Sequence, residues 1–179
     1  LGEIPQDKEV AKHRHGAPNV SVNEEENGML SESFRILRTN MAFMGKKDKP
    51  MKVVTFTSFN EGAGKTFISR NLAMSLVFAK KRVVLVDLDI RKGTLSRHFH
   101  KHPVGVTNYL ADESIALTDV IRTDEKSGNL DIISSGTVAP NPAELLMDSR
   151  LDTMMAELRK RYDYVIVDNV PVGIVADAT

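Results

Sequence analysis

A glycine-containing loop is the first stretch of this chain whose residue types could bind a ligand. Residues 62–66 read GAGKT, and they follow a run of β-branched and aromatic residues at 53–58. A strand, such a loop and a helix N-terminus, in this order, place backbone N–H groups and the helix dipole around a phosphate. Lys65 adds a full positive charge, and Thr66 offers a hydroxyl where a P-loop has its Mg²⁺ ligand. Phe59 replaces the first glycine of the strict P-loop pattern, but the segment still predicts a nucleotide site.

Carboxylates follow two further apolar runs. Residues 83–86 are all apolar and lead into Asp87, with Asp89 and Arg91 shortly after it, and a second apolar run ends in Asp168. Unbroken apolar runs are typical of strands in a parallel sheet, whose carboxyl ends are where open α/β sheets bind ligands. We therefore expect these carboxylates beside the loop, with Asp168 placed to hold Mg²⁺. A strand-end turn capped by aspartates is the alternative interpretation of Asp87 and Asp89.

The elements that would position these residues alternate between strands and helices. Strands are expected at 53–58, 82–87, 130–134 and 164–168. Helices are expected at 31–44, at 64–79, near 108–111 and 117–121, and from a helix start at Asn141 and Pro142. Repeated strand–helix units predict an α/β P-loop NTPase fold, with a doubly wound, mostly parallel sheet flanked by helices.

Two domain boundaries are predicted. Residues 1–28 have few apolar residues spaced to form a face, so we expect an extended, juxtamembrane-like arm or linker there. Residues 29–179 are expected to form the P-loop domain. Because the chain stops shortly after the run at 164–168, we expect this domain to be truncated at its C-terminus.

Composition excludes several other classes of protein. The chain has 179 residues, 41% of them hydrophobic, which is enough for one domain with a substantial core. Its 24 basic and 24 acidic residues balance, so no net field draws it to nucleic acid, and none is expected as a partner. It contains no cysteine, which rules out disulfides and cysteine-based metal sites. No apolar run approaches the roughly 20 residues that a membrane-spanning helix needs.

The helix expected at 31–44 carries charges at three-residue steps, namely Glu32, Arg35 and Arg38. Its apolar stripe is expected from residues that recur every three or four positions: Phe34, Leu37, Met41 and Met44. On spacing alone we interpret the charged side as a solvated face with ion pairs worth a few tenths of a kcal/mol. A docking surface for a neighbouring subunit is the alternative.

Together these motifs resemble the bacterial tyrosine kinases, the P-loop enzymes that accompany capsule and exopolysaccharide export. The loop resembles the family's Walker A motif, and Asp87, Asp89 and Arg91 resemble its D-x-D-x-R motif. Asp168 and Pro171 resemble its D-x-x-P motif. The similarity extends to the first five residues, to residues 141–146, and to an E-x-x-R-x-x-R helix matched by Glu32, Arg35 and Arg38.

The resemblance implies phosphoryl transfer from ATP, with Mg²⁺, to a tyrosine hydroxyl. It implies that Lys65, Asp87 and Asp89 are catalytic, with Asp87 accepting the tyrosine proton, and an exchange of roles between Asp87 and Asp89 stays open. It implies Thr66, Asp89 and Asp168 as Mg²⁺ ligands. The implied nucleotide site comprises Glu61, Gly62, Ala63, Gly64, Lys65, Thr66, Phe67 and Arg91.

The resemblance also implies partners and a location. Glu32, Arg35 and Arg38 would form a homo-oligomeric ring, and a membrane polysaccharide co-polymerase region, fused or separate, would place the domain on the cytoplasmic face of the bacterial inner membrane. The family's C-terminal tyrosine cluster is absent, because the chain's only tyrosines are Tyr109, Tyr162 and Tyr164. We therefore expect the acceptor beyond Thr179 or on another chain, such as the tyrosine-rich tail of a neighbouring subunit.

Two other functions stay open. A partitioning or division-site switch ATPase of the same P-loop class would carry a signature lysine at the position of Asn60, and neither Asn60 nor Glu61 is positively charged. A non-catalytic, nucleotide-gated assembly module would bind nucleotide without turning it over.

Overall fold

The computed structural model describes residues 3–4, 28–45, 50–58, 64–99, 102–124, 127 and 130–169. A five-stranded sheet runs through this part of the chain in the order β1-β5-β2-β4-β3. Its strands are β1 (Val53–Phe56), β2 (Val83–Asp87), β3 (Ile121–Asp124), β4 (Leu130–Ile133) and β5 (Tyr164–Asp168). The first four strands in this order are parallel, and β3 pairs antiparallel with β4 at the edge. The predicted α/β fold with a mostly parallel sheet is confirmed.

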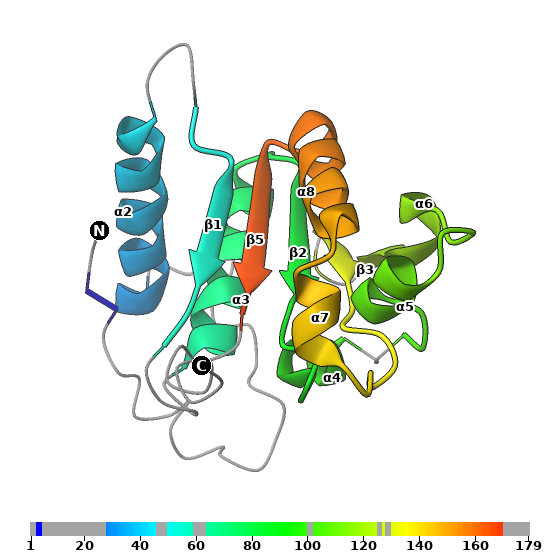
Figure 1. Ribbon diagram of the computed structural model, residues 1–179. Helices are drawn as coiled ribbons and strands as arrows, with labels where there is room; N and C mark the ends of the chain where they lie inside the picture. The colour runs from blue at the N-terminus through cyan, green and yellow to red at the C-terminus, as the bar shows by residue number, and fades with distance from the viewer. Residues whose placement is uncertain are drawn as a thin grey trace.

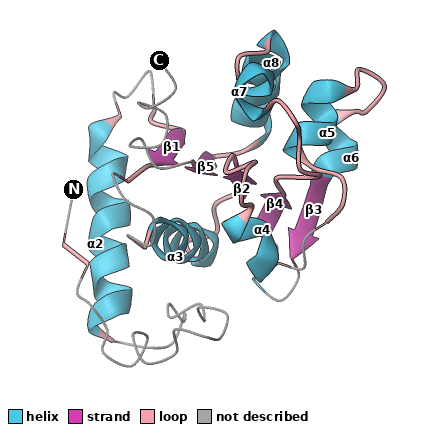
Figure 2. Ribbon diagram, turned by 60° about the horizontal axis from the view of Figure 1, so that its bottom comes forward, coloured by secondary structure: helices cyan, strands magenta, loops and turns pink. Residues whose placement is uncertain are grey.

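Helices cover both faces of the sheet (Figures 1 and 2). One face carries α2 (Met29–Met44) and α3 (Lys65–Phe78), and the short α4 (Thr94–His98) follows β2 on the same side. The other face carries α5 (Val106–Ala111), α6 (Leu117–Val120), α7 (Pro142–Leu146) and α8 (Ser149–Arg161). No helix within these described residues is long and apolar enough to cross a bilayer.

The strand β2 shows how the sequence builds this layered core. All five of its residues are buried, and successive side chains of a strand point to opposite faces. Val83 and Leu85 accordingly pack with α2 and α3, whereas Val84 and Val86 pack with α5 and α8. Because both faces are covered, an unbroken apolar run is the pattern that such a strand requires.

The edge strand β3 is the main element that the sequence pattern does not predict. The helix expected near 117–121 ends at Val120, and the chain turns directly into Ile121–Asp124. Two of its four residues are exposed, so it lacks the apolar run that marks the central strands. Its pairing with β4 forms the strand.

Two smaller expectations also differ from the structure. Met44 is 59% exposed and does not join the apolar stripe of α2, which is made instead by Leu30, Phe34, Leu37 and Met41. Of the predicted arm at 1–28, only residues 3–4 and 28 are described, and Ile4 is partly buried against the core cluster to which α2 and α3 contribute.

Candidate phosphate and metal site

The predicted site residues meet at the carboxyl edge of the parallel strands. In the register of the sheet, Asp168 at the end of β5 lies opposite Phe56 of β1 on one side and Asp87 of β2 on the other. The loop that follows β1 leads into α3, which starts at this edge (Figure 1). The two carboxylates and the start of α3 therefore share one end of the sheet.

The start of α3 has the form of a phosphate-binding turn. Gly64 precedes the helix with φ 85°, in the left-handed region that favours glycine. Lys65 is the first residue of this 14-residue helix, so its charge adds to that of the unpaired first-turn amides. The predicted nucleotide contacts Glu61, Gly62 and Ala63 lie outside the described residues.

Asp168 has a buried oxygen that could bind a cation. Thr66 Oγ1 donates a hydrogen bond of 2.6 Å to Asp168 Oδ2, while Oδ1 is buried without a partner among the described residues. Burial raises the pKa of Asp168, the hydrogen bond from Thr66 and the charge of Lys65 oppose this, and the nearby charge of Asp89 adds to it. A buried carboxylate oxygen beside a threonine hydroxyl suits Mg²⁺, which prefers oxygen ligands.

Asp87 is fully buried and its carboxylate is held on both oxygens. Oδ2 accepts hydrogen bonds from the backbone N–H and the Oγ of Ser96, at 2.9 Å and 2.5 Å. Oδ1 accepts the N–H of Asp89 at 3.0 Å. Burial raises the pKa of Asp87 to about 7, the bonds from Ser96 oppose this, and the charge of Asp168 adds to it. The group therefore exchanges a proton near neutral pH.

The other predicted residues at this edge occupy different surroundings. Asp89 is half-buried, and its Oδ1 accepts the N–H of Lys92 at 3.1 Å in the turn after β2. Arg91 is exposed in the same turn. The ring of Phe67 packs in the core against Phe34, with 6.5 Å between ring centroids, so its backbone amide is the part of Phe67 that a nucleotide could contact.

The charged residues predicted on one face of α2 have different partners in the structure. Arg35 and Glu32 form an ion pair of 2.9 Å, with both side chains about half exposed. Arg38 instead turns toward α3, where its Nη1 donates to the carbonyl oxygen of Ser75 at 2.6 Å. Arg38 thus joins α2 to α3, and Glu32 with Arg35 forms the solvent-facing part of the motif.

The three tyrosines of the described residues lie in packed surroundings, and Tyr164, in β5, is half-buried against the core. Tyr109 is buried, and the guanidinium of Arg150 lies 4.3 Å from the centre of its ring. Tyr162 is also buried, and its hydroxyl donates to Asp131 Oδ2 at 2.6 Å. Burial first, and then this hydrogen bond, raises the pKa of Tyr162. Both are poor phosphate acceptors in this arrangement.

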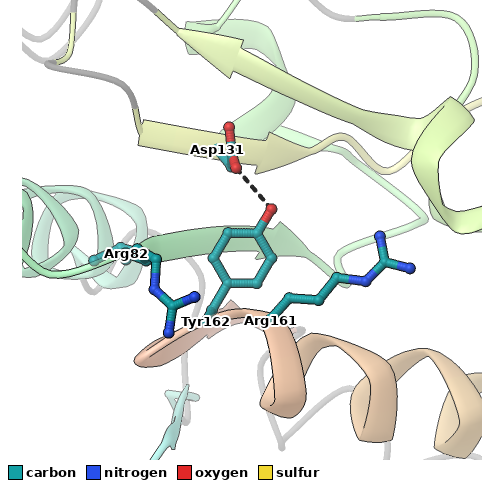
Figure 3. Close-up of a pocket in the computed structure, with 5 residues that line it drawn as sticks. Arg82, Asp131, Arg161 and Tyr162 are labelled. Atoms are coloured by element: carbon teal, nitrogen blue, oxygen red, sulfur yellow. Dashed lines mark hydrogen bonds between the residues drawn. The ribbon is translucent and has the colours of Figure 1, made fainter.

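A pocket beside Tyr162 is separate from the predicted site. It measures ≈ 270 Å³ and is lined by Arg82, Val83, Asp131, Arg161 and Tyr162. Figure 3 shows the Tyr162 hydroxyl pointing to Asp131, with Arg82 and Arg161 on either side of the ring. Val83 is the first residue of β2, and Tyr162 lies between the end of α8 and the start of β5. The pocket therefore lies at the amino edge of these strands, opposite the phosphate site.

Ser96 is the residue of this site that sequence reasoning misses. It is fully buried and contributes two of the hydrogen bonds to Asp87. A serine nine positions after an aspartate carries no recognisable signal, because serines are common in turns and short helices. Only the fold of the segment after β2 brings Ser96 to the carboxylate.

Known proteins are similar to this chain in both sequence and architecture. The family model described as an AAA domain matches residues 51–177. Tyrosine-protein kinase CpsD of Streptococcus pneumoniae is 40% identical over 152 residues, which are 82% of this chain and 63% of the relative. The chain therefore spans less than two thirds of that protein.

Solved structures agree with this similarity. The kinase domain of the Escherichia coli tyrosine kinase ETK matches with a TM-score of 0.84 and 31% identity, over 99% of this chain and 71% of that one. The septum site-determining protein MinD of Pyrococcus horikoshii, complexed with Mg-ADP, is 24% identical with a TM-score of 0.55 and shares the fold alone. By the family model and these similarities, the chain belongs to the bacterial tyrosine kinases, within the AAA-domain proteins.

Proposed function

We propose that this chain is the nucleotide-binding part of an ATP-dependent protein-tyrosine kinase that phosphorylates its own subunits in trans and regulates capsule or exopolysaccharide export. The observation that carries this proposal is the Thr66–Asp168 pair, with its unpartnered carboxylate oxygen, next to the buried carboxylate of Asp87. A purely structural strand end has no need for two buried acids in register. The similarity to CpsD and to the kinase domain of ETK, both named as tyrosine kinases, supports the type of reaction.

The proposed roles follow from where each group lies. Lys65 and the first-turn amides of α3, with Gly64 before them, hold the phosphates of ATP. Thr66, Asp168 and Asp89 hold Mg²⁺, which neutralises charge on the phosphates. The MinD structure with Mg-ADP supports nucleotide and magnesium use in this fold in general.

Asp87 is proposed to accept the proton of the tyrosine hydroxyl. A tyrosine hydroxyl has a pKa near 10, so a carboxylate accepts its proton only with tight positioning and with help from the new bond to phosphorus. Tyr109 and Tyr162 are packed in place, and Tyr164 is half-buried in β5 against the core. The acceptor is therefore proposed on the tyrosine-rich tail of a neighbouring subunit.

The partners are proposed on the same basis. Glu32 and Arg35 form an exposed pair on α2 that can exchange partners with a second copy, and Arg38 braces the helix against α3. We propose that this helix forms the contact of a homo-oligomeric ring. A membrane polysaccharide co-polymerase region would hold the ring at the cytoplasmic face of the bacterial inner membrane.

The test uses the full-length protein, incubated with Mg-ATP and analysed for phosphotyrosine by mass spectrometry. Lys65→Ala is expected to abolish the label, whereas Lys81→Ala, at an exposed position after the end of the same helix, is expected to keep it. Undiminished phosphotyrosine in Lys65→Ala would refute the assigned site. Release of free phosphate without phosphotyrosine would favour a switch ATPase, and bound nucleotide without either product would favour an assembly module.

A further inference from the structure

The carboxylate of Asp87 is fixed mainly by one residue, Ser96. The backbone N–H and the hydroxyl of Ser96 both donate to Asp87 Oδ2, at 2.9 Å and 2.5 Å. The other oxygen, Oδ1, has a single described donor, the N–H of Asp89 at 3.0 Å. Two donors on one oxygen set the rotation of the carboxylate, so Oδ1 is the oxygen that is left with capacity to accept a proton.

Ser96 is itself held by the neighbouring strand. The N–H of Ser135, just after β4, donates to Ser96 Oγ at 2.8 Å, and Ser135 Oγ lies 3.3 Å from the same atom. All three side chains are buried, Asp87 and Ser96 completely and Ser135 to 2% exposure. The Ser96 hydroxyl therefore has its acceptor side occupied by Ser135 and its proton directed to Asp87.

The backbone around Ser96 is also fixed. Gly93, directly before α4, has φ 56° in the left-handed region, and a Cβ there would lie 2.5 Å from Ser135 Oγ. A side chain at this position would push α4 away from the end of β4. The close approach keeps the Ser96 N–H and hydroxyl at hydrogen-bonding distance from Asp87.

We propose that Ser96 is a positioning residue that fixes the orientation of the Asp87 carboxylate for phosphoryl transfer, an inference that rests on the proposed function. In that transfer the tyrosine O–H proton passes to Asp87, the tyrosine oxygen bonds to the γ-phosphorus, and the bond from this phosphorus to the bridging oxygen breaks to release ADP. Ser96 touches neither nucleotide nor tyrosine in this scheme. Its contribution is the orientation of the accepting oxygen.

The kinetic test compares two buried serines of the same cluster in the full-length protein. Ser96→Ala removes the hydroxyl that donates to Asp87, and we expect kcat for phosphotyrosine formation to fall about tenfold or more with KM for ATP nearly unchanged. Ser135→Ala removes a hydroxyl but keeps the amide that orients Ser96, and we expect a fall of less than about threefold. Ser96→Thr keeps both donors and is expected to recover most of the rate.

Each outcome of this comparison bears on the proposal. Equal losses of kcat in Ser96→Ala and Ser135→Ala would overturn it, because removal of either hydroxyl from the cluster would then have the same effect. A proportional rise in KM for ATP would also overturn it, since the effect would lie in nucleotide binding. Failure of Ser96→Thr to exceed Ser96→Ala would do the same, provided that thermal unfolding shows both variants folded.

A second measurement does not depend on activity. A double-mutant cycle of Ser96→Ala and Asp87→Asn is followed by urea unfolding without Mg²⁺ or nucleotide. If the contact is as described, the shift in unfolding midpoint caused by Ser96→Ala becomes smaller when Asp87 is replaced. Additive shifts would overturn the contact itself. If the wild-type protein forms no phosphotyrosine, the proposed function fails, and the cycle still decides whether Ser96 and Asp87 are coupled.

Discussion

Replacing Asp87 by asparagine is expected to stabilise the folded protein at neutral and alkaline pH when Mg²⁺ and nucleotide are absent. Burial raises the pKa of Asp87 from 3.8 to about 7, so the folded state binds this proton more tightly than the unfolded chain does. The free energy of unfolding therefore falls as the pH rises from about 4 to about 7, and the stability that the bound proton confers is lost above that range. Asparagine is neutral throughout and avoids this loss.

The magnitude follows from the two pKa values and the hydrogen bonds. Their difference means that the ionised carboxylate lowers the free energy of unfolding by about 4 kcal/mol at about pH 8, compared with a neutral group. The NH₂ group of the new asparagine would face another hydrogen-bond donor, either Ser96 or the N–H of Asp89. This loss of a hydrogen bond costs about 1–2 kcal/mol. The expected net gain is about 2–3 kcal/mol at about pH 8. The charge of Asp168 is one cause of the raised pKa of Asp87, so Asp87→Asn also removes a repulsion between two carboxylates, which favours the variant.

The assay is urea unfolding of both proteins with EDTA, from about pH 5 to about pH 8. The difference in unfolding free energy between Asp87→Asn and the wild type should grow in favour of the variant as the pH rises. Asp152→Asn, on the exposed side of α8, is the matched control, and its difference should stay nearly constant. The reasoning would be refuted if Asp87→Asn were no more stable than the wild type at about pH 8, or if the difference in unfolding free energy did not depend on pH.

Three further substitutions test other contacts. Arg38→Ala should lower the free energy of unfolding by about 1–3 kcal/mol, because it removes a charged donor between α2 and α3. Arg35→Ala breaks an exposed ion pair and should change this free energy by less than about 1 kcal/mol. Equal effects of the two variants in urea unfolding would contradict this. Arg150→Ala should cost about 2–4 kcal/mol, since Arg150 donates to three carbonyls around α5 and covers an aromatic ring, and calorimetry showing no loss would contradict it. Thr66→Val should weaken Mg²⁺-dependent binding of a fluorescent ADP analogue about tenfold or more by removing the partner of Asp168, and unchanged Mg²⁺ dependence would remove Thr66 from the metal site.

The sequence by itself determined the order along the chain of the parallel strands and of the longer helices, and the kind of site. The strands β2 and β5 are largely apolar runs that each end in an aspartate, and GAGKT lies between a strand and a helix. These are local patterns, because burial of a strand on both faces requires an apolar run whatever its neighbours are. The rule that ligands bind at the carboxyl ends of parallel strands then places Asp87 and Asp168 near the loop.

The tertiary structure decided which groups touch. The register that puts Asp168 opposite Asp87, the turn that brings Ser96 back to β2, and the contact of Arg38 with α3 all join residues distant in sequence or set by loop geometry. The edge strand β3 likewise exists through its pairing with β4. Periodicity reports which side of an element is buried, but not which neighbour covers it. The pKa of Asp87, the orientation of its oxygens and the division of the α2 charges depend on those neighbours, so only the folded chain could settle them.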